Sequence, residues 1–283
     1  MTTSPSWELA GNFGRAPAIG KTPPVLECVV NVSEGRDRRR IDRLAAAAGT
    51  ALLDLHTDPD HHRSVLTLAG AEAVRAVAAE AVAVLDLRDH AGAHPRIGVV
   101  DVVPFVALEG STAAEALDAR DRFCDWAGTE LGVPCFRYGP ERTLPEIRRS
   151  AFTVLLPDRG PAAPHPTAGA IAVGQRPVLV AYNVWLAEPD VALAKRIAME
   201  VRSPSVRALG LQVGDRVQVS MNLIDPAVTG PGLATDAVAA LAPIDGCELV
   251  GLVPRWVLDL EPPERWGELD LAEDRTIEAR LRR

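Results

Sequence analysis

The chain has 283 residues, of which 47% are hydrophobic and 24% are charged. That balance is typical of a folded globular protein, and the length allows two units of ordinary domain size. The 38 acidic residues outnumber the 30 basic ones, which gives a formal charge of −8. A dedicated nucleic-acid binder needs a basic surface, so we expect no nucleic-acid partner, although arginines clustered locally can still bind small anions.

Membrane and secretory features are absent from the sequence pattern. No run of about 18 apolar residues is present, so we expect no membrane partner. Residues 1–23 are polar, lack the apolar core of a signal peptide and are predicted to be a disordered N-terminal extension. The four cysteines include no C-x-x-C pair. We therefore expect a cytoplasmic protein with reduced thiols.

The first half of the chain shows four predicted strands and two predicted helices. The strands fall at 25–33, 51–56, 63–68 and 97–108, and the helices at 37–48 and 71–87. Asp37 is a suitable N-cap for the first helix. The order β-α-β-β-α-β is that of the split-βαβ, ferredoxin-like motif.

The second half repeats this order. Strands are predicted at 177–186, 206–213, 216–223 and 247–253, and helices at 190–201 and 231–241. The sequence therefore predicts an α+β protein (an α/β sandwich) of two ferredoxin-like βαββαβ subdomains, with mixed sheets and helices on one face. We place the first subdomain at 24–176 and the second at 177–283.

An insert separates the two repeats. Helices are predicted at 112–131 and 144–151, with a short strand at 134–138 and then a Gly/Pro-rich loop at 157–174. A loop of that length inside a compact protein is usually functional or disordered. We favour a functional loop because it is not of low complexity and joins the two units. A charged helix is predicted at about 271–281.

Five of the six histidines fall in one stretch and allow three interpretations: His56, His61, His62, His90 and His94. His90 and His94 have the i, i+4 spacing of two metal ligands on a helix. Gly92 and Pro95 disfavour a helix there, and the H-E-x-x-H pattern is missing, so we expect no metal. In the polar turn before Arg63, a solvated position is the simpler interpretation for His61, whereas His62 can face a cleft.

His94 has a second interpretation as a catalytic residue. The following proline holds it extended, and Arg96 stands two residues further on, just before a predicted strand. That setting suits proton transfer beside an anionic substrate, while a solvated turn histidine is the plainer alternative.

The segment Asn31-Val32-Ser33-Glu34 ends the first strand, where residues of these types serve either in sites or in ordinary turns. The loop at 160–169 either cradles a flat ring or a carboxylate, or is a linker.

Four segments, in order, resemble the formiminotransferase family of folate-dependent glutamate formimidoyltransferases. They are E-C-V-V-N-V-S-E-G at 27–35, D-P-D-H-H-R-S-V at 58–65, A-H-P-R-I-G-V-V-D-V-V-P-F at 93–105 and D-R-G-P…H-P-T-A-G-A-I-A-V-G at 158–174. The third is long and specific. The segments V-S-M-N-L at 219–223 and E-L-V-G-L-V-P at 248–254 also fit, so the resemblance covers about residues 25–283.

The resemblance implies a fold of two ferredoxin-like subdomains with the substrates in a groove between them. It implies transfer of the formimino group of N-formimino-L-glutamate to tetrahydrofolate, without a metal, by a chain that forms a homodimer. His94 becomes the catalytic residue, which as a neutral imidazole accepts a proton from folate N5 and returns one to the leaving glutamate nitrogen. Arg63 and Arg96 become candidates for bidentate pairing with the substrate carboxylates.

The remaining site residues follow from the same matched segments. The substrate-binding candidates are Asn31, Ser33, Glu34, His62, Arg63, Arg96 and Asp101. The folate-binding candidates are Gly160, Pro161, Ala162, Ala163, Pro164, His165, Pro166, Thr167, Ala168 and Gly169.

Some positions depart from the family pattern. Val30 replaces a usual proline, His62 a usual asparagine and Arg159 the aromatic residue of D-F-G-P, and His56 aligns with an aspartate of some relatives. Arg159 either removes a ring contact or adds one to the glutamyl tail. These changes motivate an alternative, a folate-binding paralogue with a changed donor (formylglutamate with 5-formyltetrahydrofolate) or without catalysis. The length leaves no room for a cyclodeaminase domain, so no deaminase activity is expected.

Overall fold

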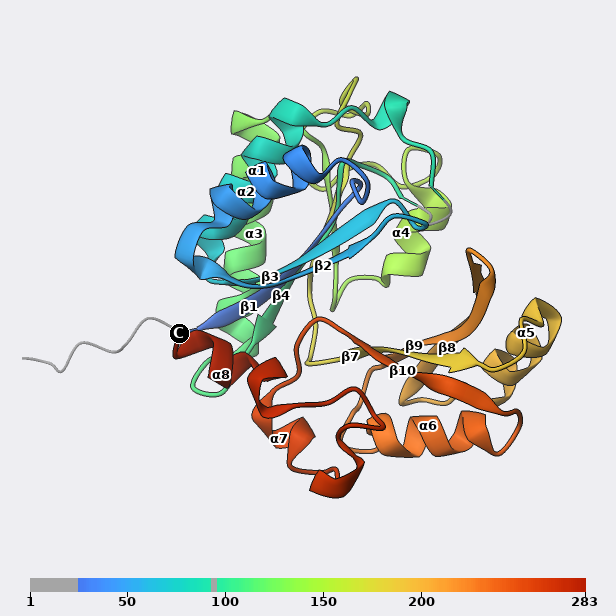
Figure 1. Cartoon of the computed structure of the whole chain (residues 1–283). Helices are drawn as coiled ribbons and strands as arrows, with labels where there is room; N and C mark the ends of the chain where they lie inside the picture. The colour runs from blue at the N-terminus through green and yellow to red at the C-terminus, as the bar shows by residue number, and fades with distance from the viewer. Residues whose placement is uncertain (1–24, 93–95) are drawn as a thin grey trace, which may run out of the picture.

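The computed structural model describes residues 25–92 and 96–283 (Figure 1). The predicted extension at 1–23 and the catalytic candidate His94 lie outside the described residues. Within those ranges, no helix is both long enough and apolar enough to cross a bilayer.

The first subdomain is built on a six-stranded sheet in the order β2-β3-β1-β4-β6-β5. Its strands are β1 (Leu26–Val32), β2 (Leu52–Asp58), β3 (Arg63–Ala69), β4 (Val100–Ala107), β5 (Cys135–Tyr138) and β6 (Ile171–Gln175). The first four pair antiparallel as in a ferredoxin-like unit, which confirms the predicted motif. β6 and β5 extend the sheet beyond β4 and run parallel to it.

Helices cover both faces of this sheet. α1 (Arg38–Ala48), α2 (Ala71–Val84) and α3 (Ala113–Glu130) lie on one face, and the Asp37 carboxylate caps α1 as predicted by accepting from the N–H groups of Arg39 and Arg40. α4 (Leu144–Ser150) covers the other face at the β5 end, where it buries Ile147 against Phe136. The prediction that helices lie on one face of each sheet is wrong for α4, because β5 and β6, the strands that extend the sheet, are apolar on both sides.

The second subdomain repeats the ferredoxin-like order. Its strands are β7 (Val180–Leu186), β8 (Val206–Val213), β9 (Arg216–Leu223) and β10 (Ile244–Val250), in the order β10-β7-β9-β8. α5 (Val191–Glu200) and α6 (Pro231–Ala239) pack on one face. This sheet is antiparallel throughout, so the predicted mixed sheet occurs only in the first subdomain, where strands are added in parallel.

Several predicted elements differ in extent from the observed ones. The helix predicted at 71–87 ends at Val84, and Leu87 begins a separate 3-10 turn whose N–H donates to the Thr167 carbonyl. The loop predicted at 157–174 ends earlier, because its apolar end pairs between β4 and β5 as β6. The helix predicted at 271–281 is a 3-10 turn, Glu273–Arg275, followed by the short α8 (Ile277–Leu281), and α7 (Arg255–Leu258) precedes both.

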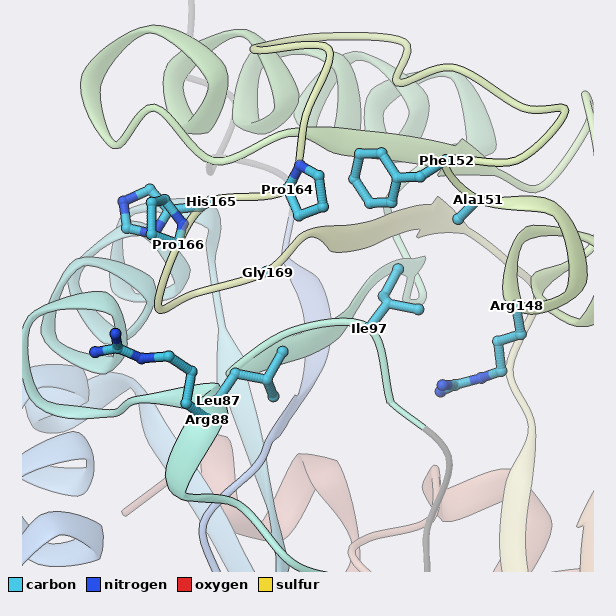
Figure 2. A pocket seen from close by; sticks show the side chains of 10 residues that line it. All are labelled: Leu87, Arg88, Ile97, Arg148, Ala151, Phe152, Pro164, His165, Pro166 and Gly169. Atoms are coloured by element: carbon cyan, nitrogen blue, oxygen red, sulfur yellow. The ribbon is translucent and has the colours of Figure 1, made fainter.

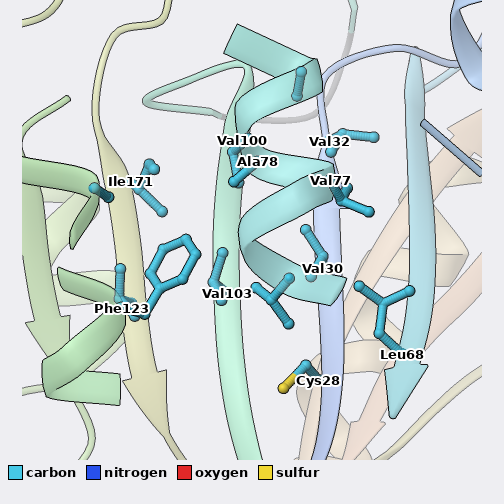
Figure 3. Close-up of a cluster of buried hydrophobic side chains, with 14 of the residues drawn as sticks. Cys28, Val30, Val32, Leu68, Val77, Ala78, Val100, Val103, Phe123 and Ile171 are labelled. Carbon is cyan, nitrogen blue, oxygen red and sulfur yellow. The ribbon is translucent and has the colours of Figure 1, made fainter. Parts of the chain in front are cut away.

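Each subdomain has its own hydrophobic core. In the first, Cys28, Val30 and Val32 of β1 point toward α2 and α3 (Figure 3). Because side chains alternate along a strand, Asn31 of β1 and Arg63 of β3 lie on the opposite face of the sheet. That face holds the polar residues from which the candidate site is built.

The subdomains touch through α8 and through the uncovered faces of the two sheets. Ile277 of α8 packs against Leu53 and Leu252. His56 Nε2 of β2 lies 3.6 Å from Glu248 Oε1 of β10, and the Asn183 side chain donates to the other oxygen of Glu248 at 3.0 Å. Polar side chains therefore connect the two sheets.

Candidate active site

Ser33 and Glu34 are buried just after β1 and hold the backbone around the site. Ser33 Oγ donates to the Gly98 carbonyl at 2.8 Å, and the Ser33 N–H donates to the Val99 carbonyl at 2.8 Å. Glu34 Oε1 accepts from the N–H groups of Arg36 at 2.8 Å and Asp37 at 3.0 Å. These contacts compensate the buried carboxylate and tie β1 to the segment that enters β4.

His62 and His90 form a stacked pair, with ring centroids 4.2 Å apart. His62 Nδ1 accepts from the Gly35 N–H at 3.0 Å, and His90 Nε2 donates to the His62 carbonyl at 2.8 Å. His90 Nδ1 accepts from the Arg96 guanidinium. Burial lowers the pKa of both rings below the ordinary value of 6.5, so both are neutral at pH 7.

Asp58 organises the turn between β2 and β3. Its Oδ1 accepts from the N–H groups of Asp60 and His61, both at 2.9 Å, and its Oδ2 contacts His61 Nδ1. Burial opposes ionisation of this carboxyl, but the hydrogen bonds from His61 outweigh it and lower the pKa of Asp58 to about 2. His61 is 8% exposed, so the solvated turn expected for it is wrong. The turn is packed because Gly92 lies directly on the His61 backbone.

Asp101 is the centre of a charged cluster on the sheet face opposite α1–α3. It is 2% exposed and accepts from the Ile97 N–H at 2.8 Å. Arg148 of α4 donates to Oδ2 through Nη2 at 2.6 Å, and its Nη1 lies 3.4 Å from Oδ1. Burial lowers the pKa of the nearby Arg63, which the carboxylates of Asp58 and Asp101 partly offset.

A cavity of about 420 Å³ lies between α4, the loop that precedes β6 and the segment that enters β4 (Figure 2). Its walls are mostly apolar, with one guanidinium toward each end. The lining residues are Leu87, Arg88, Ile97, Arg148, Ala151, Phe152, Pro164, His165, Pro166 and Gly169. Phe152 has a φ of 59°, which is uncommon for an aromatic residue, and its ring lies at the cavity beside Pro164.

The predicted folate loop contributes to this cavity with its second half. Pro164, His165, Pro166 and Gly169 line the cavity, whereas residues 160–163 are exposed and Thr167 and Ala168 are not among the lining residues. His165 Nδ1 accepts from the Ala168 N–H at 3.0 Å, so the neutral ring carries its proton on Nε2. Gly169 is necessary here because a Cβ would lie 2.3 Å from the Ile97 carbonyl oxygen.

Arg159 lies away from the cavity. Its Nε donates to Asp125 of α3 at 2.5 Å, the side chain is 45% exposed, and it is not a lining residue. The neighbouring Asp158 anchors the start of the loop by accepting from the Arg137 N–H at 2.8 Å and from the Arg142 guanidinium. The aromatic side chain that lines the cavity is instead that of Phe152, two residues after α4.

The structure therefore groups the sequence candidates in two sets: the loop residues that line the cavity, and the substrate-binding candidates in and around the charged cluster. Arg63, Asp101 and Arg96 share one charged cluster, and Ser33, Glu34 and His62 support its edge. The Asn31 side chain donates to the Val29 carbonyl at 3.0 Å.

Sequence reasoning missed Arg148 and Phe152, since the only available signal was a predicted helix at 144–151 with two arginines near its end. Among the residues described, no group of three or more His, Cys, Asp or Glu side chains is arranged to hold a metal ion.

The chain has clear relatives among known proteins. Residues 25–176 match the family model described as the formiminotransferase domain, N-terminal subdomain. A glutamate formimidoyltransferase of Streptococcus pyogenes serotype M1 is 35% identical over 232 residues, which is 71% of this chain and 78% of the relative. A second one, of Thermoplasma acidophilum, is 34% identical over 83% of this chain and 89% of its own length. The formimidoyltransferase-cyclodeaminase of Sus scrofa is 32% identical over 81% of this chain, which spans about half (50%) of that relative. The chain belongs to the formiminotransferase family.

Proposed function

We propose that this protein is a glutamate formimidoyltransferase, which moves the formimino group of N-formimino-L-glutamate to tetrahydrofolate and releases L-glutamate. Family membership and relatives of that name over most of the chain support the activity. The observation that carries the proposal is the cavity of about 420 Å³, because the loop that the family resemblance assigns to folate forms one of its walls.

The cavity suits a flat ring that carries an anionic tail. Its volume is within the usual range of small-molecule sites. Phe152, Pro164 and Pro166 offer apolar surface to a ring, while Arg88 and Arg148 supply cations toward the two ends (Figure 2). These residues fit tetrahydrofolate as the co-substrate.

The reaction requires two proton transfers. A bond forms between N5 of the acceptor and the formimino carbon, and the bond from that carbon to the glutamate nitrogen breaks. One proton leaves N5, and one reaches the glutamate nitrogen. We propose His94 for both transfers, on the strength of the H-P-R match, and such assistance is typically worth about 10²–10⁴-fold in rate.

The charged cluster would bind the substrate carboxylates. Arg63 and Arg96 are the proposed partners, and Asn31 would face the same substrate from β1. Ser33, Glu34, His62 and Asp101 would act by holding these groups, in line with their contacts inside the protein. An acidic protein can bind anions in this way because a few placed guanidinium groups determine the local charge. The homodimer and the cytoplasmic location stay predictions.

The test is turnover by the purified protein with tetrahydrofolate and N-formimino-L-glutamate, followed by absorbance after acid converts the product to methenyltetrahydrofolate. We expect turnover in the wild type and a loss of about 10²–10⁴-fold in kcat for His94→Ala. Tetrahydrofolate affinity, measured by calorimetry, should be retained in that variant. A wild-type protein that binds tetrahydrofolate but gives no product from this donor would contradict the proposal.

A further inference from the structure

Gln218 is a buried polar residue of the second subdomain that the proposed reaction does not yet use. Its neighbours on β9, Val217 and Val219, pack into the core with α5 and α6, so the Gln218 side chain lies on the opposite face of the sheet. Gln218 is 2% exposed. Within residues 25–92 and 96–283, its Oε1 has no hydrogen-bond partner. An amide oxygen buried without a partner is costly and rare in native proteins.

The face of the sheet that carries Gln218 is turned toward the first subdomain. α6 covers the other face, on the side away from that subdomain (Figure 1). At β10, Glu248 Oε1 lies 3.6 Å from His56 Nε2 of β2. In the register of the sheet, Asn183 of β7 pairs with Glu248 on one side and with Ser220 of β9 on the other. Ser220 is two residues from Gln218 and shares its face, so one contact between the subdomains lies beside Gln218.

A second contact lies on the other side of Gln218, at the tip of the β8–β9 hairpin. A Cβ built at Gly214 would lie 3.7 Å from Asp60 Oδ2, in the turn between β2 and β3. Along β9, Gln218 is therefore placed between this tip and the contact of β10 with β2. Arg63, the proposed partner of a substrate carboxylate, begins β3 directly after the same turn. Gln218 thus faces the end of the first sheet at which we propose that the donor binds.

The unpaired atom of Gln218 is an acceptor, so a ligand that satisfies it must donate a hydrogen bond. The formimino group of the donor has N–H at its terminal nitrogen, whereas a formyl group has an oxygen there, and carboxylates only accept. Tetrahydrofolate also has N–H groups, but Gln218 is not among the residues that line the cavity proposed for it. The formimino group is therefore the substrate group that fits this oxygen.

We propose that Gln218 accepts a hydrogen bond from the terminal N–H of the formimino group and thereby selects formimino donors over formyl donors. The inference rests on the proposed function and names the residue that recognises the transferred group. A formyl oxygen in the same place would face the Gln218 oxygen, acceptor against acceptor, and both would stay unpaired. Specificity is strongest where the wrong ligand leaves a buried polar group without its partner.

The first experiment compares two donors in Gln218→Met, which removes the amide but keeps nearly the same size. By calorimetry, wild-type protein should bind N-formimino-L-glutamate about 10- to 100-fold more tightly than N-formyl-L-glutamate. In Gln218→Met the affinity for the formimino donor should fall by about that factor, while the affinity for the formyl donor stays within about threefold of wild type. The preference should therefore disappear, and the Kd for tetrahydrofolate should change by less than about threefold.

Two further variants separate recognition from structure. Gln212→Met is the matched control, because Gln212 belongs to the same hairpin but is exposed on β8, and its donor preference should equal that of wild type. Gln218→Glu keeps an acceptor oxygen and should keep the preference for the formimino donor. It replaces Gln218→Met if the melting temperature shows that the latter does not fold. A folded Gln218→Glu that has lost the preference would contradict the inference.

The ratio of the two donor affinities decides the inference. An unchanged ratio in Gln218→Met, equal weakening of both donors, or a change confined to tetrahydrofolate would overturn it. If the wild type turns over the formimino donor and Gln218→Met does so with the same kcat/KM, the proposed function stands and the role of Gln218 is refuted. If the wild type gives no product but binds the formimino donor through Gln218, only the proposed function is refuted. A wild type that binds neither donor would refute both.

Discussion

The two subdomains share one topology but differ in what they add to it. The second is a plain ferredoxin-like unit whose antiparallel sheet carries helices on one face. The first adds β5, β6 and α4 to the β4 edge, together with the loop that borders the cavity. Because Arg148, Phe152 and the loop all come from the addition, the site depends on what was added to the repeat rather than on the repeat alone.

The subdomains also differ in their buried polar groups. In the first, Asp101 is buried among arginines beside the cavity. In the second, Asn183 is buried on the sheet face and bonds to Glu248. A buried charge is more costly to leave unpaired than a buried amide. Substitutions that break a buried pair should therefore lower the free energy of unfolding more in the first sheet than in the second.

The largest effect is expected for Asp101→Asn. This change removes the countercharge of Arg148 and should lower the free energy of unfolding by about 3–5 kcal/mol. Asn183→Ala, its counterpart in the second sheet, should cost only about 1–2 kcal/mol. Urea denaturation of the two variants measures both values, and equal losses would mean that the buried carboxylate contributes no more to stability than the buried amide does.

The next largest effect concerns the close packing of the segment that enters β4. A Cβ at Gly98 would lie 2.0 Å from the Ala170 carbonyl oxygen, so Gly98→Ala must displace β6 or the loop before it. We expect a loss of about 2–4 kcal/mol in stability together with weaker tetrahydrofolate binding. Gly267→Ala in the second subdomain, where nothing lies within 4 Å of the added carbon, should change stability by less than about 0.5 kcal/mol.

A pH effect is expected from Asp58. Its pKa is lowered from the ordinary 3.8 to about 2, so the folded state favours the ionised form more than the unfolded state does. This stabilisation is present above about pH 4 and is lost as the pH falls through 2. Asp58→Asn should therefore be less stable than wild type by about 1–2 kcal/mol at pH 7 and nearly equal to it at pH 2, in thermal melts across that range.

The smallest effect is expected where the sheets meet. The His56–Glu248 contact is long, at 3.6 Å, and both side chains are partly exposed. His56→Ala should change the free energy of unfolding by less than about 1 kcal/mol. Chemical denaturation checks this, and a larger loss would mean that the first subdomain depends on the second for its stability.

Local patterns predicted most of the fold. The strands at 206–213 and 216–223 have the predicted bounds because a Gly-Asp turn separates two β-rich runs, and Asp37 caps its helix as its residue type suggests. β6 was missed since its few apolar residues follow a loop rich in Gly and Pro. Only its position between β4 and β5 makes it a strand.

The site was less accessible to sequence reasoning, because side-chain direction and burial arise from tertiary packing. Nothing in the order Arg148-Arg149 shows that the first faces Asp101 and the second faces solvent. The polar turn predicts a solvated His61, but in the folded protein the residue is only 8% exposed. The loop at 160–169 was located by resemblance, while the division between its exposed first half and its cavity-lining second half required the fold.

The position of β4 has a kinetic consequence. This strand pairs with β1 on one side and β6 on the other, and its residues from Val100 to Val106 are buried. The backbone amides of such an interior strand exchange with solvent hydrogen only when the whole unit opens. Asp101, and through it Arg148, is thus attached to an element that should be among the slowest of the chain to exchange, so local opening of the surface loops leaves the charged cluster in place.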